Sequence, residues 1–250
     1  MSTGDNLFIL PPPSSPPAAV NMSLSQNGLR VAMMCKAGIG RRTGKCEVWD
    51  IVTQKNVAEL DVPAPVGGSS PTAVFSPDGT RIVIAAFANS PQGARVMTVS
   101  GYDLKTGEKL ATVEDFGAQG AITMQAANDH LLILASSTGR MWTIDYANGQ
   151  IGDDFDTLVA RGEAPVYGPI AISPDGKHFA TGIVGEPFTT YGVRVYDLAT
   201  KKAVHTFIGH AGPVCTVHFS PDGASLASGA QGTSVILWNL TNAGTEKKSR

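Results

Sequence analysis

Histidine and aspartate are the side chains of this sequence best suited to acid–base chemistry near neutral pH, and their spacing argues against a shared catalytic site. His130 and His178 follow turn sequences, whereas His205 and His218 occupy alternating positions of extended segments. The aspartates recur mainly in repeated turn phrases, where a short carboxylate can accept hydrogen bonds from the following backbone amides. No Gly-x-Ser-x-Gly sequence supports a serine nucleophile. We therefore expect a chain without enzymatic activity.

A phosphate-binding loop and a metal site are also disfavoured. The segment from Gly38 to Lys45 is rich in glycine and basic residues, but it lacks the strand-to-helix context and the Gly-Lys-Ser/Thr ending of such loops. We interpret it as a hairpin loop that can contact an acidic partner. No Cys-x-x-Cys or paired-histidine spacing indicates zinc, so we expect no cofactor. A hairpin could place Cys35 opposite Cys46, and the sequence is compatible with a bridge, although two buried reduced thiols are favoured.

Composition excludes several classes of partner. Nineteen basic and 21 acidic residues give a net charge of −2, which supplies no cationic field for nucleic acid. No apolar run approaches the roughly 18 residues that span a bilayer. The N-terminal region has no basic segment followed by a long apolar one, since Leu7–Leu10 is only four residues long. We expect a cytoplasmic chain that binds neither nucleic acid nor membrane.

A turn phrase recurs through the chain. Phe75-Ser76-Pro77-Asp78-Gly79 returns at 172–176 and 219–223, and weaker copies stand at 24–28 and 125–129. The fifth positions of successive copies lie 51, 50, 47 and 47 residues apart. Proline fixes φ at the second position, aspartate can bond the next amides, and glycine accepts a positive φ. The spacing is that of a four-stranded propeller blade.

A second phrase closes a third strand in each unit. It reads Val48-Trp49-Asp50 in the first unit and Leu237-Trp238-Asn239 in the last, with related copies at 101–103, 143–145 and 195–197. A fourth strand follows in most units. Short strands, tight turns and the absence of a helical period predict an all-β fold, a five-bladed β-propeller of four-stranded antiparallel blades.

The last unit resembles a WD repeat. The resemblance rests on Gly209-His210 at its start, the Ser-Pro-Asp-Gly turn, and Trp238-Asn239 at the end of its third strand. It implies a structural network of His210, Ser228 and Trp238. Family members often add an aspartate in the turn between the second and third strands. Gly232 stands at the matching position here, so we expect the network to lack its fourth member.

The repeats predict one propeller domain over residues 1–250. The blades span about 18–62, 63–114, 115–160, 161–208 and 209–241, and 242–250 is a polar tail. The last unit has no fourth strand of its own, whereas Leu7–Leu10 belongs to no unit. We expect Leu7–Leu10 to complete the last blade and close the ring, with residues 11–17 as a stiff proline-rich connection.

The longest loops are expected on one face of the disc. The loops between second and third strands are long at Lys36–Lys45, Phe87–Arg95 and Val184–Gly192, and rigid scaffolds commonly bind through such loops. Aromatic and arginine side chains are frequent interface anchors. In the alternative, Phe87 and Phe188 fold back onto their own loops. The candidate binding residues are Arg41, Arg42, Phe87, Arg95, Arg140, Tyr167, Phe188 and Tyr191.

These features predict a protein–protein interaction scaffold that binds through the long-loop face and is monomeric in isolation. One alternative is a small-ligand or enzymatic propeller that uses its central channel, which converging charged residues at the channel mouth would favour. Another is a fragment of a larger WD-repeat protein. The sequence does not identify the partner.

Overall fold

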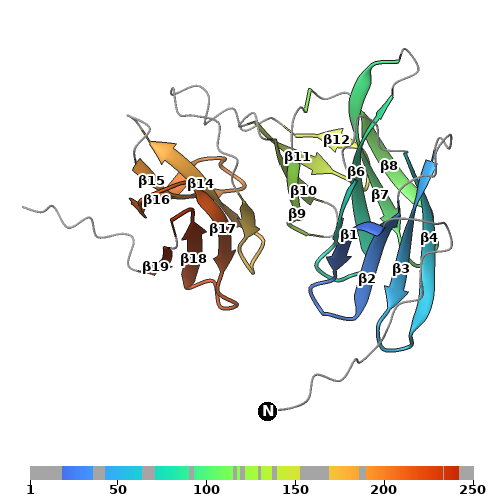
Figure 1. The fold of residues 1–250 in the computed structure, drawn as a ribbon, viewed down its shortest axis with the longest axis horizontal. Helices are drawn as coiled ribbons and strands as arrows, with labels where there is room; N and C mark the ends of the chain where they lie inside the picture. Colours follow the sequence, from blue (N-terminus) through green and yellow to red (C-terminus); the bar gives the residue numbers. More distant parts are fainter. Residues whose placement is uncertain are drawn as a thin grey trace, which may run out of the picture. The chain divides into compact units, whose positions relative to one another are not determined.

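The computed structural model describes eleven stretches of the chain, and the regular structure within them is entirely β (Figure 1). The stretches are 19–35, 43–63, 71–89, 93–114, 117–118, 122–128, 131–136, 140–152, 169–185, 190–232 and 234–241. No helix in them is long and apolar enough to cross a membrane.

Five antiparallel sheets follow one another along the chain, and we call each a blade. Blade 1 contains β1 (Ala19–Leu24), β2 (Arg30–Cys35), β3 (Thr43–Asp50) and β4 (Lys55–Pro63). Blade 2 contains β5 (Thr72–Phe75), β6 (Arg81–Asn89), β7 (Arg95–Asp103) and β8 (Lys109–Glu114). Blade 3 contains β9 (Ile122–Ala126), β10 (Leu131–Ser136), β11 (Met141–Asp145) and β12 (Gln150–Ile151). Blade 4 contains β13 (Ile170–Ile172), β14 (His178–Gly185), β15 (Thr190–Asp197) and β16 (Ala203–His210). Blade 5 contains β17 (Val214–Phe219), β18 (Ser225–Ala230) and β19 (Val235–Asn239).

The predicted all-β architecture of antiparallel, four-stranded blades is thus confirmed for four sheets, and the fifth has three strands in the described residues. The proposed closing strand Leu7–Leu10, the proline-rich residues 11–17 and the tail 242–250 lie outside the described residues. Within the described residues, β19 pairs with β18 alone, and the side chains of Val235 and Leu237 on it are each 76% exposed.

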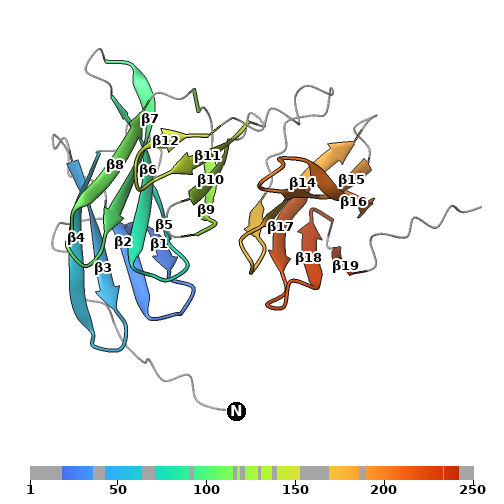
Figure 2. The same cartoon turned by 180° about the vertical axis from the view of Figure 1, so that it is seen from behind.

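The chain divides into two compact units. The first is Met1–Ala118 with Asn128–Leu131 and Asp145–Gln150. The second is Gln119–Ala127, Leu132–Ile144 and Ile151–Arg250. Figure 2 shows blades 1 and 2 within the first unit and blades 4 and 5 within the second, each as a set of sheets stacked face to face.

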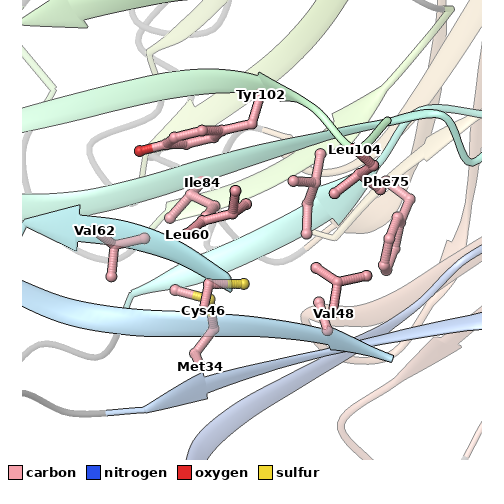
Figure 3. Close-up of a cluster of buried hydrophobic side chains, with 11 residues drawn as sticks. Met34, Cys46, Val48, Leu60, Val62, Phe75, Ile84, Tyr102 and Leu104 are labelled. Carbon is pink, nitrogen blue, oxygen red and sulfur yellow. The ribbon is translucent and has the colours of Figure 1, made fainter. Parts of the chain in front are cut away.

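The core of the first unit lies between blades 1 and 2 (Figure 3). Because side chains alternate across a strand, Ile82 and Ile84 of β6 face blade 1 while Val83 and Ala85 face the other way. All four are buried, which is typical of a strand covered on both sides. The cluster contains Ala32, Met34, Cys46, Val48, Leu60, Val62, Phe75, Ile82, Ile84, Tyr102 and Leu104.

The same alternation builds two cores in the second unit. Phe179 and Tyr196, whose rings stack at 4.9 Å, join Ile133 of blade 3 in one buried cluster. Their strand neighbours Ala180 and Val195 point the other way and join Val217 and Leu226 of blade 5 in another. Blade 4 is therefore covered on both faces.

The Ser-Pro-Asp-Gly turns join the first and second strands by one recurring set of hydrogen bonds. In blade 2, Ser76 Oγ donates to Asp78 Oδ1 at 2.6 Å and accepts from Arg81 N, and Thr80 N donates to the same carboxylate oxygen. Gly79 sits at φ 72°, where a residue without Cβ is favoured. Blade 1 makes the same turn with Asn27 in the aspartate position.

Successive turns lie next to one another. In the first unit, Arg30 Nη1 donates to the carbonyl oxygen of Gly79. In the second unit, a Cβ added to Gly223 would lie 3.7 Å from Pro174 Cδ. Within each unit, neighbouring blades therefore present their turns on the same side.

One prediction about the first hairpins is wrong. Phe87 lies within β6 rather than in a loop, since the pairing of β6 with β7 continues to Asn89↔Arg95. The backbone register pairs Cys46 with Met34 and Cys35 with Lys45. Cys46 is a buried cysteine outside any disulfide, in agreement with the favoured interpretation of reduced thiols.

Candidate functional site

His210 connects blade 4 to blade 5 through hydrogen bonds. It is the last residue of β16, and its Nε2 lies 2.6 Å from Ser228 Oγ on β18. Trp238 on β19 donates its indole N–H to the same oxygen at 2.8 Å. His210 and Ser228 are both buried. One serine hydroxyl therefore holds the end of blade 4 and the third strand of blade 5 together.

The network has a fourth member that the sequence comparison with WD repeats missed. His210 Nδ1 lies 2.8 Å from Ser234 Oγ, so the expectation that Gly232 leaves this place empty is wrong. Gly232 has φ 101° and occupies the turn itself, and the hydroxyl comes from the residue two positions later. A serine brings no negative charge, and burial lowers the pKa of His210, so the imidazole is neutral at neutral pH.

Aromatic rings extend this network along β16. Trp238 stacks on Phe207 with centroids 5.2 Å apart, and Phe207 stacks on His205 at 5.8 Å. Gly209 leaves room for the indole, since an added Cβ would lie 3.1 Å from Trp238 Cη2. Gly209 and His210 thus act together, one by giving space to the tryptophan and the other by binding its serine.

The aspartates of the second phrase also bind backbone. Asp50 Oδ1 accepts from Thr53 N at 2.7 Å, and Asp197 Oδ1 accepts from Thr200 N at 2.7 Å. In both cases the backbone hydrogen bond is the first cause that holds the carboxyl pKa below its usual value. Asn239 Oδ1 accepts from Thr241 N, two positions further on, at the end of β19 in blade 5. Asp50 and Asp197 thus shape the turn between the third and fourth strands of blades 1 and 4.

The predicted binding residues are only partly described. Arg41, Arg42, Tyr167 and Phe188 lie outside the described residues. Phe87 is buried at 8% exposure, and the Arg95 guanidinium lies 4.1 Å from the centre of its ring. The prediction that Phe87 is an exposed anchor is therefore wrong, and the alternative of folding back onto its own loop does not describe it either, since Phe87 is a buried residue of β6.

Two further residues of this set belong to the second unit. Arg140 is exposed, and its guanidinium lies 5.3 Å from the centre of the buried Trp142 ring. Tyr191 is half-buried and lies within β15, where it pairs with Val184 and His210, rather than in a loop. Arginine over an aromatic ring is a favourable cation–π arrangement, so Arg95 and Arg140 are each held in place by a ring beneath them.

A cavity of about 340 Å³ opens in the second unit between blades 4 and 5. It lies where the turn between β13 and β14 meets the turn between β17 and β18. Its floor and walls combine apolar surface with two aspartates and two histidines. The lining residues are Ser173, Pro174, Asp175, His178, Val195, His205, Phe219, Asp222, Gly223, Leu240 and Thr241.

The two aspartates of the cavity are held as anions by their turns. Asp175 Oδ1 accepts from Ser173 Oγ at 2.5 Å and from Lys177 N, and Asp222 Oδ1 accepts from Ser220 Oγ at 2.6 Å. The serine hydroxyl is in each case the first cause that lowers the carboxyl pKa. The sequence did not predict this cavity, because its two halves are 47 residues apart and meet only through blade packing.

Within the described residues, no group of three or more histidine, cysteine, aspartate or glutamate side chains is arranged to hold a metal ion. His178 lies 4.0 Å from Asp175 Oδ1 and 3.9 Å from Asp197 Oδ2, both at the long end of ion-pair distance.

Consecutive antiparallel blades, a repeated Ser-Asp turn and a His-Ser-Trp network are consistent with a repeat protein of the propeller type. Comparison with known proteins agrees with this class. Residues 201–239 match the family described as WD domain, G-beta repeat, which is the stretch that contains the His210 network. In this stretch the chain is similar to WD-repeat proteins.

Individual relatives match over part of the chain. It is 38% identical over 63 residues to human WD repeat-containing protein 36, covering 25% of this chain and 7% of that protein. It is 41% identical over 68 residues to the serine-threonine kinase receptor-associated protein of Dictyostelium discoideum, covering 27% and 22%. It is 31% identical over 93 residues to human striatin-4, covering 37% and 12%. The chain thus spans less than a quarter of each of these relatives.

Removing the shared hydroxyl should destabilise the protein. We expect Ser228→Ala to lower the free energy of unfolding by about 1–3 kcal/mol, because it leaves the Trp238 N–H and His210 Nε2 without their common partner. Ser234→Ala removes one bond to His210 and should have a smaller effect. Urea unfolding followed by circular dichroism measures both. Equal midpoints for Ser228→Ala and wild type would contradict the proposed role of the network.

The His210 network should also make stability depend on pH. Because burial lowers the folded-state pKa of His210, its contribution is fully present above the unfolded value of about 6.5 and is lost as pH falls below it. Burial also lowers the pKa of His205, with His178 as a second cause, so this residue acts in the same direction. We expect the urea midpoint of unfolding to decrease as the pH is lowered from about 7.5 to about 5.5.

The variant His210→Gln should show a smaller fall over the same interval. His218→Gln changes an exposed histidine on β17 and serves as the matched control, so it should keep the wild-type dependence. A fall of the same size in His210→Gln and wild type would exclude His210 as its source.

Proposed function

We propose that this chain is a non-catalytic scaffold for protein–protein interaction. The proposal rests on one observation: the histidine and aspartate side chains suited to acid–base chemistry form hydrogen bonds that hold the structure together. The histidine of the network binds two serines, and the turn aspartates bind backbone amides and serine hydroxyls. These side chains hold blades and turns together. Rigid scaffolds of this kind commonly bind partners through their exposed loops.

The names of several relatives support this class of function. Two proteins similar to this chain are named serine-threonine kinase receptor-associated protein and MST50-interacting protein 11. Both names describe association with another protein. The chain matches those proteins over 68 and 90 residues, which are 27% and 36% of its length.

We further propose that binding uses the ends of the hairpins between second and third strands. Arg95 over Phe87, Arg140 over Trp142 and the half-buried Tyr191 support this surface. A guanidinium already held over a ring loses less side-chain freedom on binding than an unsupported one. We include Arg41 and Arg42 in this proposal on the sequence alone, since they lie outside the described residues.

We also propose that the five blades form a closed ring. The three-stranded blade 5, with its exposed Val235 and Leu237, supports a fourth strand supplied from elsewhere. Leu7–Leu10 has the apolar composition of such a strand. A closed ring would present all five sets of hairpin ends from one rigid frame.

Capture of binding partners tests the binding surface. We expect the full chain, immobilised and cross-linked in cell extract, to retain partners that the variant Arg41→Ala/Arg42→Ala/Tyr191→Ala loses. A variant of equal charge change on another part of the chain, Lys105→Ala/Lys109→Ala, should retain them. Capture of the same proteins by both variants, or of none by wild type, would contradict the proposed surface.

A further inference from the structure

The cavity between blades 4 and 5 has an apolar floor. Val195 is buried beneath it, and Phe219 and Leu240 are partly buried in its walls. Pro174 adds an exposed apolar edge. At about 340 Å³ the space is at the small end of ligand sites, which suits one or two extended side chains rather than a large cofactor.

The rim of the cavity is acidic, because it carries the carboxylates of Asp175 and Asp222. The hydrogen bonds that the described residues give to Asp175 and Asp222 all reach Oδ1. Each turn therefore fixes its carboxylate through one oxygen and leaves Oδ2 out of the turn. Both aspartates are exposed, and charge-assisted hydrogen bonds to such oxygens are stronger than neutral ones.

The geometry points to a docking site for an arginine- or lysine-bearing segment of a partner protein, seated in the cavity between the turns of blades 4 and 5. This inference rests on the proposed scaffold function and names the chemistry of one partner. An aliphatic stem would lie on Pro174, Phe219 and Leu240, since long basic side chains bury their methylenes on apolar surface. The cationic head would then reach the carboxylates of Asp175 and Asp222.

The rest of the cavity fits this occupant. The partly exposed His178 lines the cavity and lies 4.0 Å from Asp175 Oδ1, at the long end of ion-pair distance. A stronger cation can therefore compete with it for Asp175. His205 is held in the ring stack with Phe207, so the wall that carries it is fixed.

Conservative substitutions can remove the charges without removing the turns. Asn27 in blade 1 occupies the aspartate position of the same turn and accepts from Ser25 Oγ and Leu29 N. Asp175→Asn/Asp222→Asn should therefore keep the folded structure and discharge the cavity.

A matched control exists in the first unit. Asp78 makes the same turn as Asp175, and Asp50 is a turn carboxylate that accepts from Thr53 N and Thr53 Oγ1. Neither residue lines the cavity. Asp50→Asn/Asp78→Asn thus removes two carboxylates of the same kind from a different place.

The experiment measures peptide binding by fluorescence anisotropy at about pH 7.5, where the aspartates are ionised. The probe is a fluorescein-labelled peptide of eight residues that alternates arginine with alanine, and its control peptide carries glutamine in place of arginine. We expect wild type to bind the arginine peptide and Asp175→Asn/Asp222→Asn to bind it about ten- to a hundred-fold more weakly. Asp50→Asn/Asp78→Asn should bind like wild type, and melting curves should show that all three fold.

Four results would overturn the inference. Equal affinity in wild type and Asp175→Asn/Asp222→Asn excludes the cavity, and equal losses in both double variants indicate a general effect of surface charge. Binding that appears only when Lys247, Lys248 and Arg250 are changed to glutamine in the full chain would assign the cavity to the chain's own tail, which follows Thr241 directly. If partners are captured from extract while the peptide fails to bind, the scaffold function stands and the cavity inference alone is wrong.

Discussion

Each blade of this protein is a thin sheet with two apolar faces, and neither face can be covered from within the blade. Burial of these faces against neighbouring blades is the constraint on which the rest of the structure depends. Blade 2 shows it in a single strand, where Ile82 to Phe87 are all buried. Blade 4 shows it as two separate clusters, one around Phe179 and Tyr196 and one around Ala180 and Val195. Burial of apolar area at about 25 cal/mol per Å² makes this packing the main source of stability.

Hydrogen bonds between polar groups then fix the turns within blades and the position of one blade against the next. In blades 2, 4 and 5 a serine–aspartate pair holds the first hairpin of the blade. The His210 network joins the end of blade 4 to the second and third strands of blade 5. Because Asp175 and Asp222 are fixed through one oxygen only, the same residues that shape the turns also place negative charge at the mouth of a cavity. The same repeated turn sequence therefore serves both the structure and the proposed binding cavity. The aspartates and histidines described above therefore support the proposed scaffold more readily than a catalyst.

Local signals predicted much of this architecture. The Ser-Pro-Asp-Gly copies predicted the hairpin turns, because proline, aspartate and glycine each restrict the backbone in a defined way. Ser234 was missed, because aligning the turn with the family pattern pointed to Gly232 and could not show which later side chain returns to His210. The burial of Phe87 was missed because the loop was expected to begin at Phe87, whereas the pairing of β6 with β7 continues to Asn89. The cavity was not predictable at all from local sequence, since it forms only where two repeats pack against each other.

The first and last blades each leave apolar side chains exposed. Blade 1 exposes Met22 and Leu24, and blade 5 exposes Val235 and Leu237. The proposed ring, completed by Leu7–Leu10, would give blade 5 its fourth strand. Thermal unfolding tests this account most directly, comparing the full chain with a chain lacking residues 1–12 and with a full-length chain in which residues 7–10 are all serine. A closed ring predicts that both changes lower the melting temperature by about 5–10 °C, as expected for the loss of a few kcal/mol in a chain of this size. Melting curves that coincide with that of the full chain would contradict closure by this strand.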